Sequence, residues 1–559
     1  MKSMMKGFYS NRPVLVIDDC QIYRTASRGM LIKLGFNPEQ ILVARDAATA
    51  LTLCEIESFQ LVLCDYNLGS KTDGHQLLDE IIHHDNLPAD CAVIIVTGDS
   101  SAKVVQGFAD LNSDGFLIKP INFITLQKRL PKLIQRKRML AEALISYANS
   151  DFDNTIQLAE EAVLKAEAMT SAALRLKASA LIRLNKLDEA NDLLFTIQDA
   201  SKNPYVQLEF ARIALLQKKY TLCESLLSPL EKISIISSSA LQLSAELLFK
   251  QFKFGLALEK ITEAVLKSPK NIERHIFKTH IAMAQFDIET AYKSMENALV
   301  QARYSFRDTL LLHQLTAILS LDLGQFAAPE QKQNYFALFT RHCQVWRNRF
   351  QLKEYKTFEL LMLARAHCFR GTLVKAKECL DEYQKKVQSE KNRNNTIIEK
   401  LELGKVFFML NNDDGYQSVM HQIKQELNIA SLSNEQQAIK LYIAGWMDRV
   451  DRIKDEVSTL KDISNQFLQK NNYEKVVENL IKAMTLNSLD EDIASKLLHC
   501  LTKAWPKGWS KKDVTRLALR CRDRLKNSSV SNSGEYKLLC ETLASQLNIK
   551  ELLPVLKAK

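Results

Sequence analysis

Polar side chains follow short apolar runs at four places in the first 120 residues. Asp18 and Asp19 come directly after VLVI, Asp65 after LVLC, Thr97 after VIIV, and Lys119 after FLI. Three carboxylates held close together repel one another and favour a hard divalent cation with oxygen ligands, most simply Mg²⁺. Such a cation bridges to a phosphoryl group, and one carboxylate can then act as the nucleophile. The lysine and the hydroxyl supply a positive charge and a hydrogen bond for phosphate oxygens.

For this chemistry the five side chains must meet, and the surrounding pattern predicts how. Short β-rich runs alternate with amphipathic segments, which predicts a parallel five-stranded sheet covered by helices on both faces. The expected strands are Val14–Ile17, Ile41–Ala44, Leu61–Cys64, Val93–Val96 and Phe116–Ile118. The expected helices are Gln21–Leu34, Ala47–Glu57, Gly74–His83, Ser101–Ala109 and one from Ile124 onward. Chemistry collects at the carboxyl ends of parallel strands, so we expect one shallow cleft there.

Each feature alone has a simpler interpretation, since an Asp pair after a strand often only caps a helix. That interpretation does not account for the whole set in this order. These residues resemble the receiver domain of two-component response regulators, over roughly Arg12 to Arg136. The resemblance implies a CheY-like, flavodoxin-like α/β domain that takes a phosphoryl group from a histidine kinase. It makes Asp65 the phospho-acceptor and a metal ligand, with Asp18, Asp19 and the backbone carbonyl of Asn67 as further Mg²⁺ ligands.

The resemblance also implies roles for residues near the phosphoryl group. Thr97 would be the switch hydroxyl, Lys119 the phosphate-binding lysine, and Phe116 the switch aromatic. Pro120 stands where the family has a cis-proline turn, and Asp73-Gly74 matches the start of a family helix. Phe116 departs from the frequent tyrosine, because it has no hydroxyl to donate.

A second pattern begins after about residue 137, where helical periodicity continues almost to the end of the chain. An aromatic or aliphatic residue is followed three positions later by a small one, in five pairs spaced 35, 33, 34 and 34 residues apart: Phe152/Thr155, Leu187/Ala190, Tyr220/Cys223, Phe254/Ala257 and Ile288/Ala291. Twelve residues before each small residue stands another small one: Ala143, Ala178, Ala211, Ala245 and Thr279. Small residues let two antiparallel helices approach closely, and stacked hairpins bury the remaining faces.

One such match would indicate only an ordinary helical hairpin, but five in register indicate a repeat. The period resembles the tetratricopeptide repeat, which implies a superhelix whose concave face binds a peptide or a partner protein. We expect a receiver domain at 11–136, about five repeat units at 137–300, and a further repeat-like region at 301–559. Units in the last region are expected near 364–383 and 464–488, whereas 304–350 and 385–460 look helical without fitting the repeat.

The charge of the chain is a weak argument for nucleic acid. Net charge is +10, and residues 1–136 hold 14 Lys+Arg and 15 Asp+Glu, so the excess lies in the helical part. Lys512, Arg516, Arg520 and Arg524 are spaced by four and could contact nucleic acid or an acidic partner. A solvated helix face is the simpler interpretation.

The remaining composition favours a cytoplasmic protein. Its 11 cysteines include no CxxC pair and lie in apolar stretches, as reduced buried thiols do. No apolar run approaches the ~18 residues of a membrane span, and the N-terminal segment lacks the apolar core of a signal peptide. No Walker loop, GxSxG or GxGxxG motif is present, so we do not expect an enzyme.

The sequence therefore predicts a phosphorylation-controlled signalling adaptor, in which the repeat array binds an unidentified partner protein. Two alternatives stay open. One is a nucleic-acid-binding regulator that uses the basic C-terminal region. The other is a phosphate sink, in which the receiver only drains phosphoryl groups.

Overall fold

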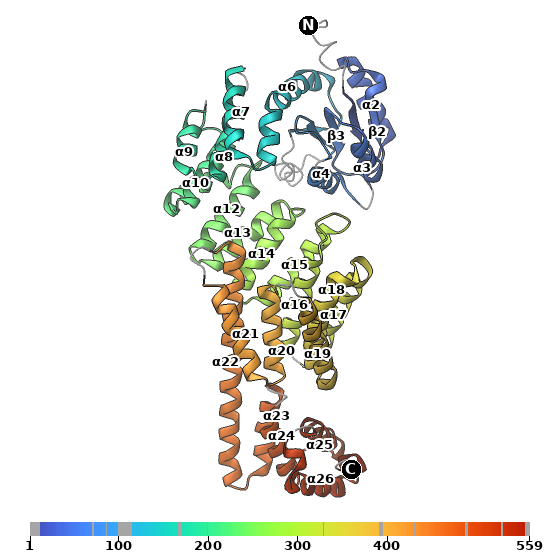
Figure 1. Ribbon diagram of the computed structural model, residues 1–559, viewed down its shortest axis with the longest axis vertical. Helices are drawn as coiled ribbons and strands as arrows, with labels where there is room; N and C mark the ends of the chain where they lie inside the picture. The colour runs from blue at the N-terminus through green and yellow to red at the C-terminus, as the bar shows by residue number, and fades with distance from the viewer. Residues whose placement is uncertain are drawn as a thin grey trace. The chain divides into compact units, whose positions relative to one another are not determined.

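The computed structural model describes residues 12–69, 72–84, 86–98, 114–165, 170–197, 199–327, 329–390, 395–428, 432–486, 490–526 and 529–553 (Figure 1). The chain forms two compact units. The first consists of residues 1–282 and 289–313, and the second of residues 283–288 and 314–559. None of the described helices is both long enough and apolar enough to cross a membrane.

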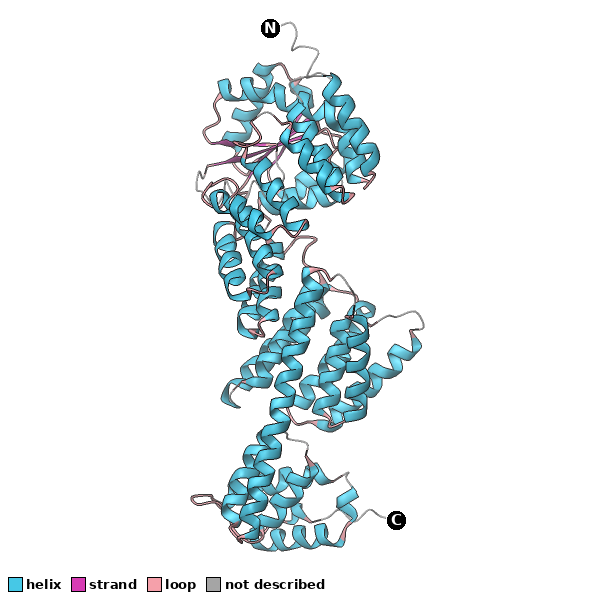
Figure 2. Ribbon diagram, turned by 90° about the vertical axis from the view of Figure 1, so that its left-hand side faces the viewer, coloured by secondary structure: helices cyan, strands magenta, loops and turns pink. Residues whose placement is uncertain are grey.

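A five-stranded parallel sheet, enclosed by helices, opens the first unit (Figure 2). Its strands are β1 (Val14–Ile17), β2 (Ile41–Ala44), β3 (Leu61–Asp65), β4 (Ala92–Thr97) and β5 (Gly115–Ile118), in the order β2-β1-β3-β4-β5. Its helices are α2 (Gln21–Leu34), α3 (Ala47–Ile56), α4 (Gly74–His83) and α6 (Phe123–Ala148). The predicted strands are confirmed, with ends that differ by one residue at most. The helix predicted at Ser101–Ala109 lies outside the described residues.

The two faces of this sheet have separate cores because successive side chains of a strand point to opposite faces. Leu15 and Ile17 belong to the core that Leu77 and Leu78 of α4 complete. Their neighbours Val14 and Val16 pack in the other core, which is closed by α2 and by α6, the latter through Leu126, Leu130 and Ile134. Both faces are therefore covered by helices, as the continuous apolar strands predict.

The passage from the sheet into the helical part is one unbroken helix. The 26 residues of α6 begin in the sheet's core and end beside the next helix, where Ala143 is 2% exposed (Figure 1). The sequence has no Gly/Ser/Pro-rich linker between the sheet and Ala143, and its one proline within this helix, Pro131, does not interrupt it.

After the sheet, the described part of the chain contains helices and short 3₁₀ turns and no further strand. The first five hairpins each consist of two helices. Their first helices are α6, α8 (Thr170–Arg183), α10 (Pro204–Leu216), α12 (Ser237–Lys250) and α14 (Ile272–Ala284). The second helices are α7 (Phe152–Lys165), α9 (Leu187–Phe195), α11 (Tyr220–Leu230), α13 (Phe254–Lys267) and α15 (Ile288–Ala302). Each second helix begins at the large residue of the predicted repeat.

The small residues of the repeat lie where two helices touch. Thr155, Ala190, Cys223, Ala257 and Ala291 are all 0% exposed. The thiol of Cys223 lies 3.2 Å from the carbonyl oxygen of Ala211, and the Thr279 hydroxyl lies 3.4 Å from that of Ala291. Positions twelve residues apart therefore face each other across a hairpin, as the packing argument requires. Assignment to the tetratricopeptide family and the exact domain limits stay predictions.

The turns of these hairpins share one backbone conformation. The residue two positions before each second helix is left-handed, with φ between 58° and 61° at Ser150, Asn185, Lys218, Phe252 and Phe286. In four of these turns the next residue's N–H bonds back to the carbonyl five residues earlier, as in Lys186 N to Leu181 O at 2.9 Å. The turn conformation therefore repeats with the period of the sequence.

The second unit continues with helical hairpins. Its helices are α16 (Leu310–Phe326, which begins in the first unit), α17 (Pro329–Arg349), α18 (Leu352–Phe369), α19 (Leu373–Ser389), α20 (Ile397–Met409), α21 (Asp413–Glu426), α22 (Asn434–Gln469), α23 (Tyr473–Leu486), α24 (Glu491–Leu501), α25 (Lys511–Leu525) and α26 (Gly534–Leu547). The left-handed turn recurs before α19, α21 and α23, at Gly371, Asn411 and Asn471. The first and third lie in the units predicted near 364–383 and 464–488.

The hairpin α20–α21 falls in 385–460, where the sequence does not fit the repeat. Tyr416 takes the position that holds a small residue elsewhere, and Gly404 faces it from twelve residues earlier. A Cβ added to Gly404 would lie 2.5 Å from Met420 Cε and 3.9 Å from the Tyr416 ring. Gly404 thus leaves room for Met420, whereas the Tyr416 ring lies at an ordinary van der Waals distance from the added Cβ.

The second unit also buries a cluster of charges. Asp322, Glu402, Arg365 and Lys405 are each at most 1% exposed. The Lys405 amine lies 2.8 Å from Asp322 and 2.7 Å from Glu402, and Arg365 is paired with the same two carboxylates. Two buried cations therefore balance two buried anions.

Candidate functional site

The register of the sheet brings the predicted site residues to one edge. Ile17, which precedes Asp18, pairs with Cys64, which precedes Asp65. Asp65 in turn pairs with Val96, directly before Thr97. Asp18, Asp65 and Thr97 therefore stand at the carboxyl ends of three adjacent strands, and all three are buried.

Lys119 joins two of these carboxylates from the end of β5. Its Nζ lies 2.8 Å from Asp18 Oδ2 and 2.8 Å from Asp65 Oδ2. The same amine lies 4.2 Å from the centre of the Tyr23 ring, on α2. With only 9% of its side chain exposed, Lys119 forms charge-assisted hydrogen bonds that are largely shielded from water.

The pKa values at this edge reflect burial and mutual pairing. Burial raises the pKa of the Asp65 carboxyl, and its hydrogen bond to Lys119 opposes that shift. Burial alone would lower the pKa of Lys119, but its bonds to Asp18 and Asp65 outweigh that effect, so the pKa is raised. The lysine therefore stays protonated, as a fixed positive charge beside the Asp65 oxygen.

The three carboxylates fit a hard divalent cation. Asp18, Asp19 and Asp65 each offer an oxygen, and these oxygens lie within 4.8 Å of one another. Arg24 fixes the first two by donating to the carbonyl oxygens of Asp18 and Asp19, at 2.6 and 2.8 Å. Gly69 approaches Asp19 so closely that an added Cβ would lie 2.6 Å from its Oδ2. This acidic set of oxygen donors suits a cation such as Mg²⁺.

A family model decides what this arrangement is. The model of the response regulator receiver domain matches residues 14–131. Residues 14–131 form a response regulator receiver domain of a two-component system.

The receiver domain is similar to two curated proteins. Chemotaxis protein CheY-3 of Vibrio cholerae is 29% identical over 126 residues, which are 22% of this chain and 94% of the relative. Transcriptional regulatory protein ZraR of Salmonella typhimurium is 29% identical over 139 residues, which are 25% of this chain and 30% of that protein. Among solved structures, the receiver domain of NtrX from Brucella abortus is 26% identical and covers 22% of this chain and 98% of its own, with a TM-score of 0.20.

The remaining predicted residues of the receiver domain lie close to the edge of the sheet that holds Asp18 and Asp65. Thr97 is 1% exposed, and its carbonyl oxygen accepts a bond from the Lys119 N–H at 2.7 Å. The peptide bond between Lys119 and Pro120 is cis, as the resemblance implies. Phe116 is half-buried and packs against the core on the α3–α4 face. Asn67 donates its N–H to Asp65 Oδ1 at 3.3 Å. The switch roles and the metal-binding carbonyl stay predictions.

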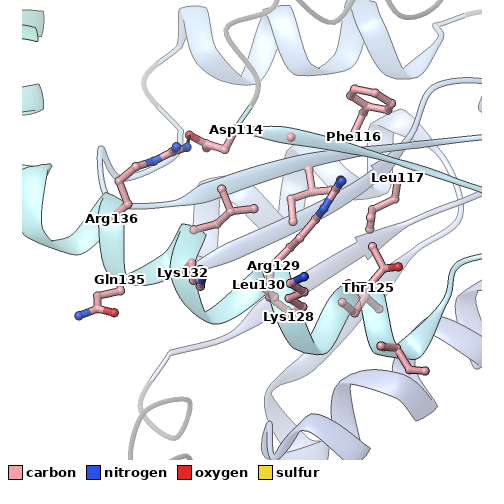
Figure 3. A pocket seen from close by; sticks show the side chains of 15 residues that line it. Asp114, Phe116, Leu117, Thr125, Lys128, Arg129, Leu130, Lys132, Gln135 and Arg136 are labelled. Atoms are coloured by element: carbon pink, nitrogen blue, oxygen red, sulfur yellow. Dashed lines mark ion pairs between the residues drawn. The ribbon is translucent and has the colours of Figure 1, made fainter. Parts of the chain in front are cut away.

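A hollow of about 900 Å³ lies elsewhere on the receiver domain, along β5 and α6 (Figure 3). Its walls are mainly apolar, with Lys128, Arg129 and Lys132 among the lining residues. Asp114 lines it too and is paired with Arg136 at 3.6 Å. None of the three clustered carboxylates lines this hollow, so it is separate from the candidate metal site.

Sequence reasoning missed the residues that hold the acceptor edge in place. Tyr23, Arg24 and Gly69 contact the site but were not predicted. Arg24 could have been found, because it lies in the first turn of the helix that follows Asp18-Asp19. Gly69 has φ 58°, a left-handed conformation in which glycine is favoured, and it occurs in a segment that holds no other motif.

Proposed function

We propose that this protein is a signalling adaptor whose receiver domain is phosphorylated on Asp65 and whose helical array binds a partner protein. The phosphodonor is a phosphohistidine of a histidine kinase, and the divalent cation is Mg²⁺. The output is binding rather than catalysis, in the cytoplasm. The array's partner stays unidentified.

The proposed transfer conserves the phosphoryl group. An oxygen of the Asp65 carboxylate attacks phosphorus, and the bond from phosphorus to the donor's imidazole nitrogen breaks. The products are an acyl phosphate on Asp65 and a free histidine on the donor. A divalent cation would supply charge neutralisation for the phosphoryl oxygens. The chain's own contribution is a nucleophile fixed at a strand end and the protonated Lys119 beside it.

The observation that carries this proposal is the position of the Lys119 amine. It lies 2.8 Å from both Asp18 and Asp65, so a phosphoryl group formed on Asp65 would replace a carboxylate as its partner. Lys119 would then stabilise the new charge without a large movement. An ion pair of Lys119 with Asp18 and Asp65 alone does not require a third carboxylate, that of Asp19, within 4.8 Å of both.

Acetyl phosphate with Mg²⁺ tests the acceptor, because this small acyl phosphate can donate its phosphoryl group to a carboxylate and releases acetate. We expect a single mass increase of one phosphoryl group at Asp65 that hydroxylamine removes, as it does from an acyl phosphate, and that is absent from Asp65→Asn. Asp90→Asn is the matched control, because Asp90 precedes β4 at the opposite edge of the sheet and is paired with Arg12. Uptake by Asp65→Asn at the wild-type rate would refute the assignment.

The helical array supports a binding role through its hairpins, which expose one set of helix faces while burying the small residues. Co-purification from the source cell with wild-type protein and with Asp65→Asn tests this role. We expect a partner protein whose recovery differs between the two. Equal recovery of every protein, together with an unchanged signalling phenotype on deletion of the array, would instead favour the phosphate sink.

The structure weakens the nucleic-acid alternative. Lys512, Arg516 and Arg520 are exposed on α25, but Arg524 is partly buried, and burial lowers its pKa to about 10. Only three of these four basic residues are thus exposed to a phosphate backbone. Salt-dependent binding of DNA or RNA to the full chain, lost on substitution of Lys512, Arg516 and Arg520, would support that alternative over the adaptor.

A further inference from the structure

One face of α4 in the receiver domain is covered by the helical array of the same compact unit. Asp73, Gln76, Asp79 and His83 follow one another at spacings of three or four, so they share a face of the helix. Each of the four contacts a residue of the segment 270–307. The contacted stripe therefore runs from the N-cap of α4 to its last residue, His83, which stays exposed.

At the start of this stripe, Lys270 contacts both ends of the loop that follows the acceptor strand. Its Nζ lies 2.8 Å from Asp73 Oδ2 and 4.0 Å from the centre of the Tyr66 ring. Tyr66 follows Asp65 directly, and its carbonyl oxygen accepts the N–H of Gly74 at 3.0 Å. Lys270 thus makes an ion pair and a cation–π contact with side chains at the two ends of the segment that leads from Asp65 into α4.

In the middle of the stripe, Arg307 holds Asp79. Its Nη2 donates to Asp79 Oδ1 at 3.0 Å, and its Nε donates to the other carboxylate oxygen. This two-point contact is the arrangement in which a guanidinium binds a carboxylate most strongly. The third nitrogen, Nη1, lies 2.8 Å from Glu273 of α14. Glu273 therefore fixes the arginine on the array side.

Two further contacts extend the interface to the ends of α15 and α4. The Gln76 amide donates to the carbonyl oxygens of Gln301 and Arg303, at 2.9 and 3.3 Å. The His83 ring stacks on Phe306 with ring centres 3.7 Å apart and planes 4° from parallel. A polar helix face, an aromatic stack and two ion pairs together make a specific fit rather than a chance contact.

The space enclosed between these groups has a volume of about 120 Å³. That is room for a few water molecules and not for an organic ligand. Asp73, Asp79, Lys270 and Arg307 line it, so its walls are charged. The interface is consequently polar, with room for water molecules that bridge its charged groups.

We propose that residues 270–307 of the array form a docking surface for the chain's own receiver domain, with Lys270 and Arg307 holding the acidic face of α4. In this arrangement the contacting face of α4 is not available to other proteins until the receiver undocks. The proposal goes beyond the adaptor function, because it needs neither phosphorylation nor an external partner. It assigns a role to a face of the receiver that contributes nothing to the acceptor edge itself.

Hydrogen exchange on the full chain, without phosphodonor, tests the docking from both sides. Asp79→Arg, a change on the receiver, should raise exchange in the array peptide 301–308 by roughly three- to tenfold, because repulsion replaces a two-point ion pair. Arg307→Asp, a change on the array, should raise exchange in the α4 peptide. The double variant Asp79→Arg/Arg307→Asp should restore both.

The matched control is Glu80→Arg, which makes the same charge change on the next residue of α4, whose side chain forms no hydrogen bond or ion pair with the described residues 270–307 and does not line the space between them. It should leave the peptide 301–308 unchanged. The proposal is overturned if Asp79→Arg affects only receiver peptides, if Glu80→Arg has the same effect, or if the charge-swapped pair does not recover. It is also overturned if protection rises with protein concentration, since docking would then join two copies of the chain. The readout involves no phosphoryl transfer, so failure here leaves the test of Asp65 untouched.

Discussion

At Gly74, the start of α4 approaches the backbone of Asp65 so closely that no side chain fits between them. A Cβ added there would lie 1.8 Å from the Asp65 carbonyl oxygen and 2.9 Å from the Asp65 carbonyl carbon. Backbone atoms do not yield as a flexible side chain does, so Gly74→Ala must displace the first turn of α4 by more than an ångström. We expect the Gly74–Tyr66 hydrogen bond to be lost, at about 1 kcal/mol. Displacing the fully buried Leu77 and Leu78 costs about 1–3 kcal/mol more.

Alanine gains up to about 1 kcal/mol over glycine within a helix, so the net loss for Gly74→Ala is roughly 2 kcal/mol. Hydrogen exchange of the slowest strand amides in the receiver domain measures this loss, as an increase of about thirtyfold in their opening equilibrium. Gly29→Ala in α2 is the matched control. No heavy atom lies within 4 Å of a Cβ added to Gly29. Gly29→Ala should therefore slow exchange slightly, because alanine is favoured over glycine in a helix. Equal exchange in the two variants would refute the close approach of α4 to Asp65.

Three further predictions concern the metal, the junction and the buried charges. Asp19→Ala should weaken Mg²⁺ binding roughly tenfold or more in titration calorimetry, because it removes one of three carboxylate ligands; unchanged affinity would exclude that role. Phosphorylation should change hydrogen exchange at residues 130–160, along the continuous junction helix, and changes confined to the acceptor loops would contradict this. Lys405→Met should lower the unfolding free energy of the second unit by about 3–5 kcal/mol, because Asp322 and Glu402 lose one of their two buried cations. Thermal unfolding followed by tryptophan fluorescence measures it, since all four tryptophans lie in that unit, and an unchanged midpoint would contradict it.

The receiver fold and its acceptor edge could be predicted because the relevant signals are local. Each strand is a short apolar run, and Asp18, Asp65, Thr97 and Lys119 each follow a run directly, so placing them needed no knowledge of distant contacts. Parallel pairing then places strand ends together without further information. Gly69 and Tyr23 carried no such signal, because what they do depends on a close approach or a ring contact that appears only in three dimensions.

The repeat could likewise be predicted only where its packing leaves a regular pattern in the sequence. Helix starts at Phe152 and Leu187 follow from a pattern of large and small residues, since that pattern records helix-to-helix packing. The hairpin at Gly404 and Tyr416 has the same turn, but only its first helix supplies a small residue, so a search for small residues at both positions fails there. Packing constrains the summed volume at a contact and not the identity of either partner.

The docking of α4 could not be predicted at all, because its two sides are about two hundred residues apart and each is an ordinary charged surface by itself. Its position nevertheless gives the receiver two physically distinct connections to the array. The first is covalent: the chain runs from Lys119 into α6, which continues into the array. The second is non-covalent: the segment from Tyr66 to Gly74 leads into α4, whose side chains contact the array. Asp79→Arg interrupts the second and leaves the first intact. If phosphorylation of that variant still changes exchange at 130–160 but no longer at 301–308, the two connections act independently; if both responses vanish, docking is required before the junction helix can respond.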